Sequence, residues 1–119
     1  MRVGFVVNDI KTEEQGYSTT RLGMALINLG HESWIMGAGD LAYDPDEKIH
    51  ARARSAPRNK YNASETYLAD IQGKKAKSER ITVDDLDILM LRSAPSTERK
   101  VDYMKYYRRN FDNIELATL

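Results

Sequence analysis

Residues 19–41, "TTRLGMALINLGHESWIMGAGDL", decide the fold that we expect for this chain. The first half has apolar residues at the spacing of one face of an amphipathic helix. These residues are Leu22, Ala25, Leu26 and Leu29. Gly30 follows at the position where a glycine commonly ends a helix. The second half, from residue 31, predicts a short strand that is closed by Gly37 and Gly39.

The residues before this stretch predict another strand. Val3 to Val7 form a short apolar run, which is typical of a strand buried on both faces. The loop 8–20 ends with hydroxyl residues, which are good N-caps for the helix that follows. Strand, helix and strand within residues 3–37 therefore predict one right-handed βαβ unit.

The middle of the chain has a different pattern. In residues 48–56, "KIHARARSA", apolar residues alternate with His50, Arg52 and Arg54, which predicts a half-exposed strand. Residues 65–73, "ETYLADIQG", fit either the second arm of a hairpin or a short helix that buries Tyr67, Leu68 and Ile71. The lysine-rich residues 73–80 indicate a solvated connector.

The last third predicts a further strand and helix. Ile88 to Leu91 form a third buried parallel strand, and residues 96–110 fit an amphipathic helix. Residues 110–119 form no clear stop, so we expect the native polypeptide to continue. The predicted fold class for residues 1–119 is one α/β domain: a Rossmann-like parallel sheet flanked by helices, with an antiparallel hairpin insertion.

Composition excludes several classes of function. The 119 residues include no cysteine and only two histidines, which argues against thiolate or zinc sites and favours the cytoplasm. Lysine plus arginine equals aspartate plus glutamate, 18 of each, so charge gives no reason to expect nucleic acid or a membrane. The glycine motifs of nucleotide-binding loops and a nucleophile–base pair are both absent from the sequence, so we assign no catalytic, cofactor-binding or metal residue to this chain.

Candidate binding residues follow from the predicted topology, because ligands of open parallel sheets bind beyond the carboxyl ends of the strands. Three short segments are expected there and make up the predicted substrate site. They are Asn8 and Asp9 after the first strand, Ser18 and Thr19 at the helix start, and Arg92 after the third strand. Helix N-termini and arginine both favour a carboxylate or phosphate.

Each candidate also has a purely structural interpretation. Arg92 fits a solvated strand end paired with an acid, and Asp9 fits a turn former. Ser18 and Thr19 fit helix caps. A strip of cations fits either an anion site or the wet face of an edge strand. This strip consists of Arg52, Arg54, Arg58 and Lys60.

Four stretches resemble, in order and spacing, the N-terminal domain of bacterial glutathione synthetases and related ATP-grasp ligases. They are "MRVGFVVNDI", "STTRLGMALINLGHESWIMGAGDL", "KIHARAR" and "DDLDILMLRSAPSTE". The resemblance covers nearly the whole chain. In it, Arg92 matches the arginine of the family's R-x-x-P segment, and Ser18 and Thr19 match its helix start.

The resemblance implies a pre-ATP-grasp domain of an ATP-dependent carboxylate–amine ligase. Such enzymes form an amide bond through an acyl phosphate, and their ATP, magnesium and most catalytic groups belong to later domains. The 119-residue chain alone is then inactive, its partners are small-molecule carboxylate and amine substrates, and a homo-oligomer is compatible with this assignment.

Departures from the family pattern fall at the expected cleft. Ser93, Ala94 and Ser96 replace the lysine, aspartate and second proline that commonly follow the arginine, and Asn8-Asp9 replaces an Asp-Pro pair. A related peptide or amide ligase therefore fits better than a strict glutathione assignment. Two alternatives stay open: a stand-alone binding or assembly module, and the N-terminal half of a glycosyltransferase.

Overall fold

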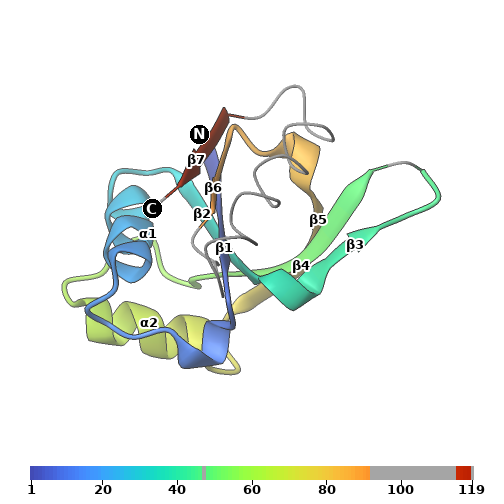
Figure 1. The fold of residues 1–119 in the computed structure, drawn as a ribbon. Coiled ribbons are helices and arrows are strands. Elements are labelled where there is room, and N and C mark those ends of the chain that lie inside the picture. Colours follow the sequence, from blue (N-terminus) through green and yellow to red (C-terminus); the bar gives the residue numbers. More distant parts are fainter. Residues whose placement is uncertain (47, 92–114, 119) are drawn as a thin grey trace.

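The computed structural model describes residues 1–46, 48–91 and 115–118 (Figure 1). The predicted helix over residues 96–110 lies outside these ranges. Within the described residues, two helices and three short 3-10 turns connect the strands of a sheet. In chain order the elements are β1 (Arg2–Val7), η1 (Ile10–Thr12), α1 (Ser18–Asn28), β2 (Glu32–Gly37), η2 (Ala38–Asp40), β3 (Leu41–Tyr43), β4 (Ile49–Ser55), α2 (Ser64–Gln72), β5 (Lys77–Thr82), η3 (Val83–Asp85), β6 (Ile88–Leu91) and β7 (Glu115–Thr118).

The sheet is mixed. Its strand order is β3-β4-β2-β1-β6-β7, and β5 pairs with β4. β1 is parallel to β2 and to β6, so that Gly4 is in register with both Trp34 and Leu89. β7 is parallel to β6, whereas β3, β4 and β5 pair in antiparallel fashion. The predicted parallel pairing therefore holds for β2, β1 and β6, whereas β7 was not predicted. The antiparallel part of the sheet consists of β3, β4 and β5.

Both helices pack on the same face of β1 (Figure 1). Alternate residues of β1 point to this face, since successive side chains of a strand point to opposite sides. The core there joins Phe5 of β1, Ile27 of α1, and Tyr67 and Ile71 of α2. The other face of β1 belongs to a second apolar cluster, in which Val6 meets residues of the curled antiparallel part. β1 is thus buried on both faces, as its sequence predicts.

The face of α1 that points inward is not the one predicted from its apolar spacing. Leu29 is 74% exposed and Leu22 is 38% exposed, whereas Thr19, Gly23 and Ile27 are buried. The reason is the close approach of α2: a Cβ atom on Gly23 would lie 2.4 Å from the Tyr67 hydroxyl oxygen. The helix therefore docks through its smallest residue. Leu22 and Leu29 face outward, whereas Leu26 is partly buried against the core.

The end of α1 follows the sequence prediction. Gly30 has φ 87°, a left-handed conformation that glycine adopts without strain. Its N–H donates to the carbonyl of Ile27 at 3.0 Å, and the His31 N–H donates to that of Leu26 at 2.9 Å. These two bonds form a Schellman motif, which satisfies carbonyls at the helix end and directs the chain into β2. At the other end the N-cap is Tyr17, whose side chain does not cap the helix, so the predicted hydroxyl cap is wrong.

The structure decides between the hairpin arm and the short helix that the sequence left open for residues 65–73. Residues 64–72 form helix α2, which buries Tyr67, Leu68 and Ile71 as the helical interpretation requires. The arm that pairs with β4 is instead β5, within the segment predicted to be a connector. Four of its six residues are exposed, which hid the strand from a hydrophobicity pattern.

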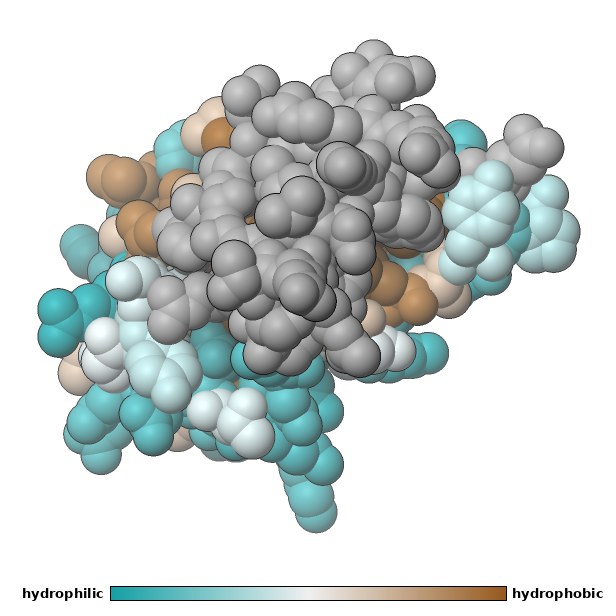
Figure 2. All heavy atoms as spheres, viewed as in Figure 1, coloured by the Kyte–Doolittle hydropathy of each residue, from teal (hydrophilic) through white to brown (hydrophobic). Residues whose placement is uncertain are grey.

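The hydropathy of the surface differs between parts of the view in Figure 2. Brown, hydrophobic surface lies on the side of α1, whereas the lower part, around α2 and its loops, is mainly teal. No helix within the described ranges is long and apolar enough to cross a membrane.

Substitution of Gly23 tests the contact between the two helices. We expect Gly23→Ala to lower the free energy of unfolding by about 1–3 kcal/mol, because overpacking against Tyr67 outweighs the better helix propensity of alanine. Urea unfolding measures this change. In a Tyr67→Phe background the same substitution should cost less, since the nearest oxygen is gone. Gly16→Ala, where no atom lies within 4 Å of the new Cβ, is the matched control; an equal loss there would contradict the contact.

Candidate functional site

A cavity of about 180 Å³ lies where β1 and β2 end. The turns η1 and η2, which directly follow these strands, provide part of its wall, and β4 and β5 provide the rest. The lining residues are Asp9, Ile10, Lys11, Asp40, Arg52, Arg54 and Ser78. Because β1, β2 and β6 are parallel, their carboxyl ends share one edge of the sheet, which is the predicted location of the site. We call this cavity the carboxyl-edge cavity.

The two aspartates of this cavity shape its turns. Asp9 is the N-cap of η1, and its Oδ1 atom accepts a hydrogen bond from the Lys11 N–H at 2.9 Å. Asp40 Oδ2 accepts from the Gly37 N–H, also at 2.9 Å. These bonds fix the direction in which the chain leaves β1 and β2. The turn-forming interpretation of Asp9 is therefore correct, and each aspartate keeps a second carboxylate oxygen.

Arg54 and Gln72 hold the end of α2 beside the cavity. Arg54 Nη1 donates to the carbonyls of Ile71 and Gln72 at 3.2 and 3.4 Å. Gln72 Nε2 donates to the Ile10 and Glu13 carbonyls at 2.9 and 3.1 Å. A cation at a helix C-terminus is stabilised by the helix dipole. Arg54 therefore has a structural role at the cavity.

Arg52 and Lys11 are the cations of the cavity that remain available. Arg52 is exposed, and within the described part of the chain neither side chain forms an ion pair. The lining contains three cationic side chains and two carboxylates. An excess of positive charge next to an arginine fork favours a carboxylate or phosphate ligand. The cavity can accept an anion.

The predicted site residues are only partly brought together. Asp9 lines the cavity, and exposed Asn8 precedes it on the same edge. Ser18 is exposed at the start of α1, whereas Thr19 is fully buried and its hydroxyl has no hydrogen-bond partner among the described residues. Ser18 and Thr19 do not line the cavity. Arg92 lies outside the described residues; β6 ends at Leu91, in register with Val6.

Lys11, Asp40 and Ser78 were missed from the sequence. Asp40 lies in the "GAGDL" segment, where an acid directly after a strand was the available signal. No feature of the sequence marked Ser78 as a site residue, because residues 73–80 were predicted to be a connector. Arg52 and Arg54 were recognised as an alternative anion strip, and the structure places both at the cavity.

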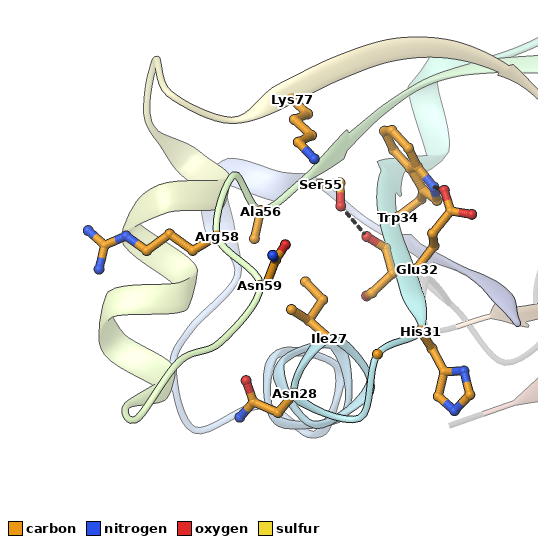
Figure 3. Close-up of a pocket in the computed structure, with 12 residues that line it drawn as sticks. Ile27, Asn28, His31, Glu32, Trp34, Ser55, Ala56, Arg58, Asn59 and Lys77 are labelled. Carbon is orange, nitrogen blue, oxygen red and sulfur yellow. Dashed lines mark hydrogen bonds between the residues drawn. The ribbon is translucent and has the colours of Figure 1, made fainter.

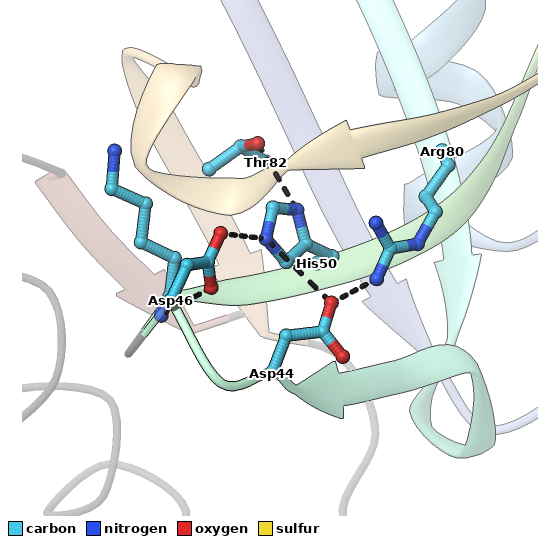
Figure 4. A network of polar contacts seen from close by, with 6 residues as sticks. Asp44, Asp46, His50, Arg80 and Thr82 are labelled. Atoms are coloured by element: carbon cyan, nitrogen blue, oxygen red, sulfur yellow. Dashed lines mark hydrogen bonds and ion pairs between the residues drawn. The ribbon is translucent and has the colours of Figure 1, made fainter.

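A second polar cluster surrounds His50 on the antiparallel part of the sheet (Figure 4). His50 is 9% exposed, although its alternating pattern predicts an exposed side chain. Its Nε2–H donates to Asp46 Oδ2 at 2.8 Å, and its Nδ1 atom lies 3.1 Å from the Thr82 hydroxyl. Asp44 Oδ2 is 3.7 Å from Nε2 and pairs with Arg80. The cluster joins the β3–β4 turn to β5. We interpret it as a structural link between these two segments and call the group of Asp44, Asp46, His50, Arg80 and Thr82 the clasp.

Together, these features define a mixed α/β domain with an anion-accepting cavity at the carboxyl edge of its parallel strands. A family model for the prokaryotic glutathione synthetase N-terminal domain matches residues 1–111. The chain therefore belongs to this family, as the sequence resemblance predicts. A comparison with curated proteins gives no match.

The pH dependence of stability tests the clasp. The hydrogen bond from His50 is the main cause that lowers the pKa of Asp46 below its ordinary value of 3.8. Stabilisation by this carboxylate is therefore fully present above pH 3.8 and is lost as the pH falls through the lowered pKa. We expect the melting temperature of the wild type to be higher than that of Asp46→Asn at about pH 6. This difference should disappear as the pH falls through the lowered pKa. Asp85→Asn, at an exposed acid, is the control; a gap that is independent of pH would contradict the clasp.

Proposed function

We propose that this chain is the substrate-cleft domain of an ATP-dependent carboxylate–amine ligase similar to glutathione synthetase. In the proposed reaction, ATP phosphorylates a substrate carboxylate, and an amine attacks the acyl phosphate to form an amide and release phosphate. This chain contributes binding groups for the substrate. The parent protein supplies the catalytic groups from outside residues 1–119.

The observation that carries the proposal is the carboxyl-edge cavity in a member of this family. Arg52 and Lys11 line this cavity and form no ion pair with any described residue, so they suit a substrate with a carboxylate group. We place Asn8 and Asp9 around the same substrate on the sheet topology, and Ser18 and Arg92 on the family resemblance. Thr19, which is fully buried, would act only by holding the start of α1 in place. Arg92 would bind the carboxylate, and the start of α1 would add favourable helix-dipole charge.

ATP and magnesium belong to the parent enzyme in this proposal. Among the side chains of residues 1–46 and 48–91, no group of three or more histidine, cysteine, aspartate or glutamate residues is placed to hold a metal ion. These residues therefore do not fit a magnesium site, and we derive no step of the reaction through ATP or magnesium from them.

Three further assignments complete the proposal. The βαβ unit β1-α1-β2 with β6 is the core of a Rossmann-like, pre-ATP-grasp domain to which the antiparallel strands are added. The protein works in the cytoplasm, in line with the absence of cysteine from the 119 residues. The parent enzyme acts on small molecules and is compatible with a homo-oligomer.

Substitution of Arg92 in the full-length protein tests the substrate role. Arg92→Ala is expected to raise the KM for the anionic substrate about ten- to hundredfold, because one charge-assisted contact is worth about 1.5–3 kcal/mol. The KM for ATP should change little. Steady-state ADP release, with each substrate varied in turn, separates the two constants.

Arg52→Gln should act in the same direction as Arg92→Ala, since Arg52 lines the cavity. Lys60→Ala removes an exposed cation that does not line the cavity and is the matched control. An unchanged KM in Arg92→Ala would return this arginine to a structural role. A protein that releases no ADP with any carboxylate and amine would reject the ligase assignment as a whole.

A further inference from the structure

A larger cavity, of about 420 Å³, lies at the opposite edge of the parallel strands (Figure 3). It is bounded by the last turn of α1, the start of β2, the end of β4 with its following loop, and the start of β5. We call it the amino-edge cavity, since β2 begins there. It shares no lining residue with the carboxyl-edge cavity.

The amino-edge cavity exists because β2 and β4 separate. Their antiparallel ladder has a single bridge, Ile35 with Arg54. Beyond this bridge the Ser55 hydroxyl donates to the Ser33 carbonyl at 2.8 Å, where a backbone N–H would bond in a continued ladder. The opening between the strand ends is thus part of the sheet architecture.

The loop that closes the cavity is fixed to α1. The Asn28 side-chain amide donates to the Tyr61 carbonyl at 2.8 Å, and its oxygen accepts from the Tyr61 N–H at 2.7 Å. Tyr61 also donates its hydroxyl to Asp70 at 2.7 Å. Because Tyr61 ties this loop to both α1 and α2, the cavity is formed in advance of any ligand, which lowers the entropy cost of binding.

Lys77 places a positive charge at this cavity. It is the cross-strand partner of Ser55, and directly opposed residues of an antiparallel pair share one face of the sheet. Figure 3 shows its ammonium group directed towards Ser55. Within the described part of the chain, Lys77 forms no ion pair.

The other charged groups of the lining are already engaged. Arg58 pairs with Asp70 at 3.4 Å and extends away from the cavity in Figure 3. Glu32 pairs with Arg2 at 3.3 Å and accepts from the Trp34 indole N–H at 3.3 Å. Among the described residues that line this cavity, Lys77 is therefore a cation without an ion-pair partner, which favours an anionic ligand.

The remaining wall is mixed. Three apolar side chains, Ile27, Trp34 and Ala56, line the cavity and are 5–7% exposed. Polar residues line the rest of it, and exposed Asn59 has an amide that can donate a hydrogen bond. A cation and an amide beside a few apolar side chains match a compact ligand with one anionic end and one small apolar end.

We propose that the amino-edge cavity is a second binding site, which takes small monocarboxylates with a compact apolar side chain. Lys77 binds the carboxylate, Asn59 donates a second hydrogen bond, and the apolar group packs against Ile27, Trp34 and Ala56. The site is separate from the proposed ligase cleft and does not depend on that function.

Trp34 reports directly on this site, because it is the one tryptophan among the 119 residues. The experiment titrates N-acetyl-L-leucine into the 119-residue chain and follows indole fluorescence. N-acetyl-L-leucinamide, which has the same apolar group without the charge, is titrated in parallel. Thermal unfolding first establishes that the chain, and each lysine variant described below, is folded. We expect a saturable change with the acid and at least about tenfold weaker binding of the amide.

Two lysine variants locate the charge that binds. Lys77→Gln should weaken binding of the acid about tenfold or more and abolish the preference over the amide. Lys75→Gln removes an exposed charge that does not line the cavity and should leave both unchanged. Equal binding of acid and amide, equal losses in the two variants, or no saturable change would each overturn the proposal. None of these results bears on Arg92 and the ligase reaction.

Discussion

β1 is hydrogen-bonded to a parallel strand on each edge, to β2 on one side and to β6 on the other. The rest of the structure depends on this pairing. Parallel strands bring their carboxyl ends to one edge of the sheet and their amino ends to the other, so the turns after β1 and β2 meet around Asp9 and Asp40. They also require a crossover, and α1 provides it on the face where α2 packs.

The sheet changes from parallel to antiparallel pairing where β2 meets β4, and this change explains the position of the carboxyl-edge and amino-edge cavities. A single bridge, Ile35 with Arg54, joins these strands, and the two cavities flank it. Arg54 and Ser78 line the carboxyl-edge cavity, whereas their chain neighbours Ser55 and Lys77 line the amino-edge cavity. Successive residues of a strand point to opposite faces, so adjacent positions on β4 and β5 serve two different sites.

Much of the fold could be predicted from local pattern. The strands at Val3–Val7, 31–37 and Ile88–Leu91, and the helix stop at Gly30, all depend on signals contained within a few residues. The errors arose where long-range packing decides. The inward face of α1 is set by Tyr67, which lies far along the chain and requires Gly23 at the contact, and β5 is a strand because β4 offers an edge. For the site, the location at the carboxyl edge and Asp9 were predictable, whereas Ser78 was not.

By itself, the sequence determined the family, the βαβ unit and the edge of the sheet where a ligand is expected, because residue order and hydrophobic period are local properties of the chain. Only the tertiary structure decided which cationic side chains of the described residues bind other parts of the chain and which face a cavity. Arg52, Arg54 and Lys77 look alike in sequence, yet Arg54 bonds to the end of α2, while Arg52 and Lys77 face separate cavities. The physical reason is that the partner of a charged side chain is set by contacts between segments far apart in the chain, which the sequence does not display.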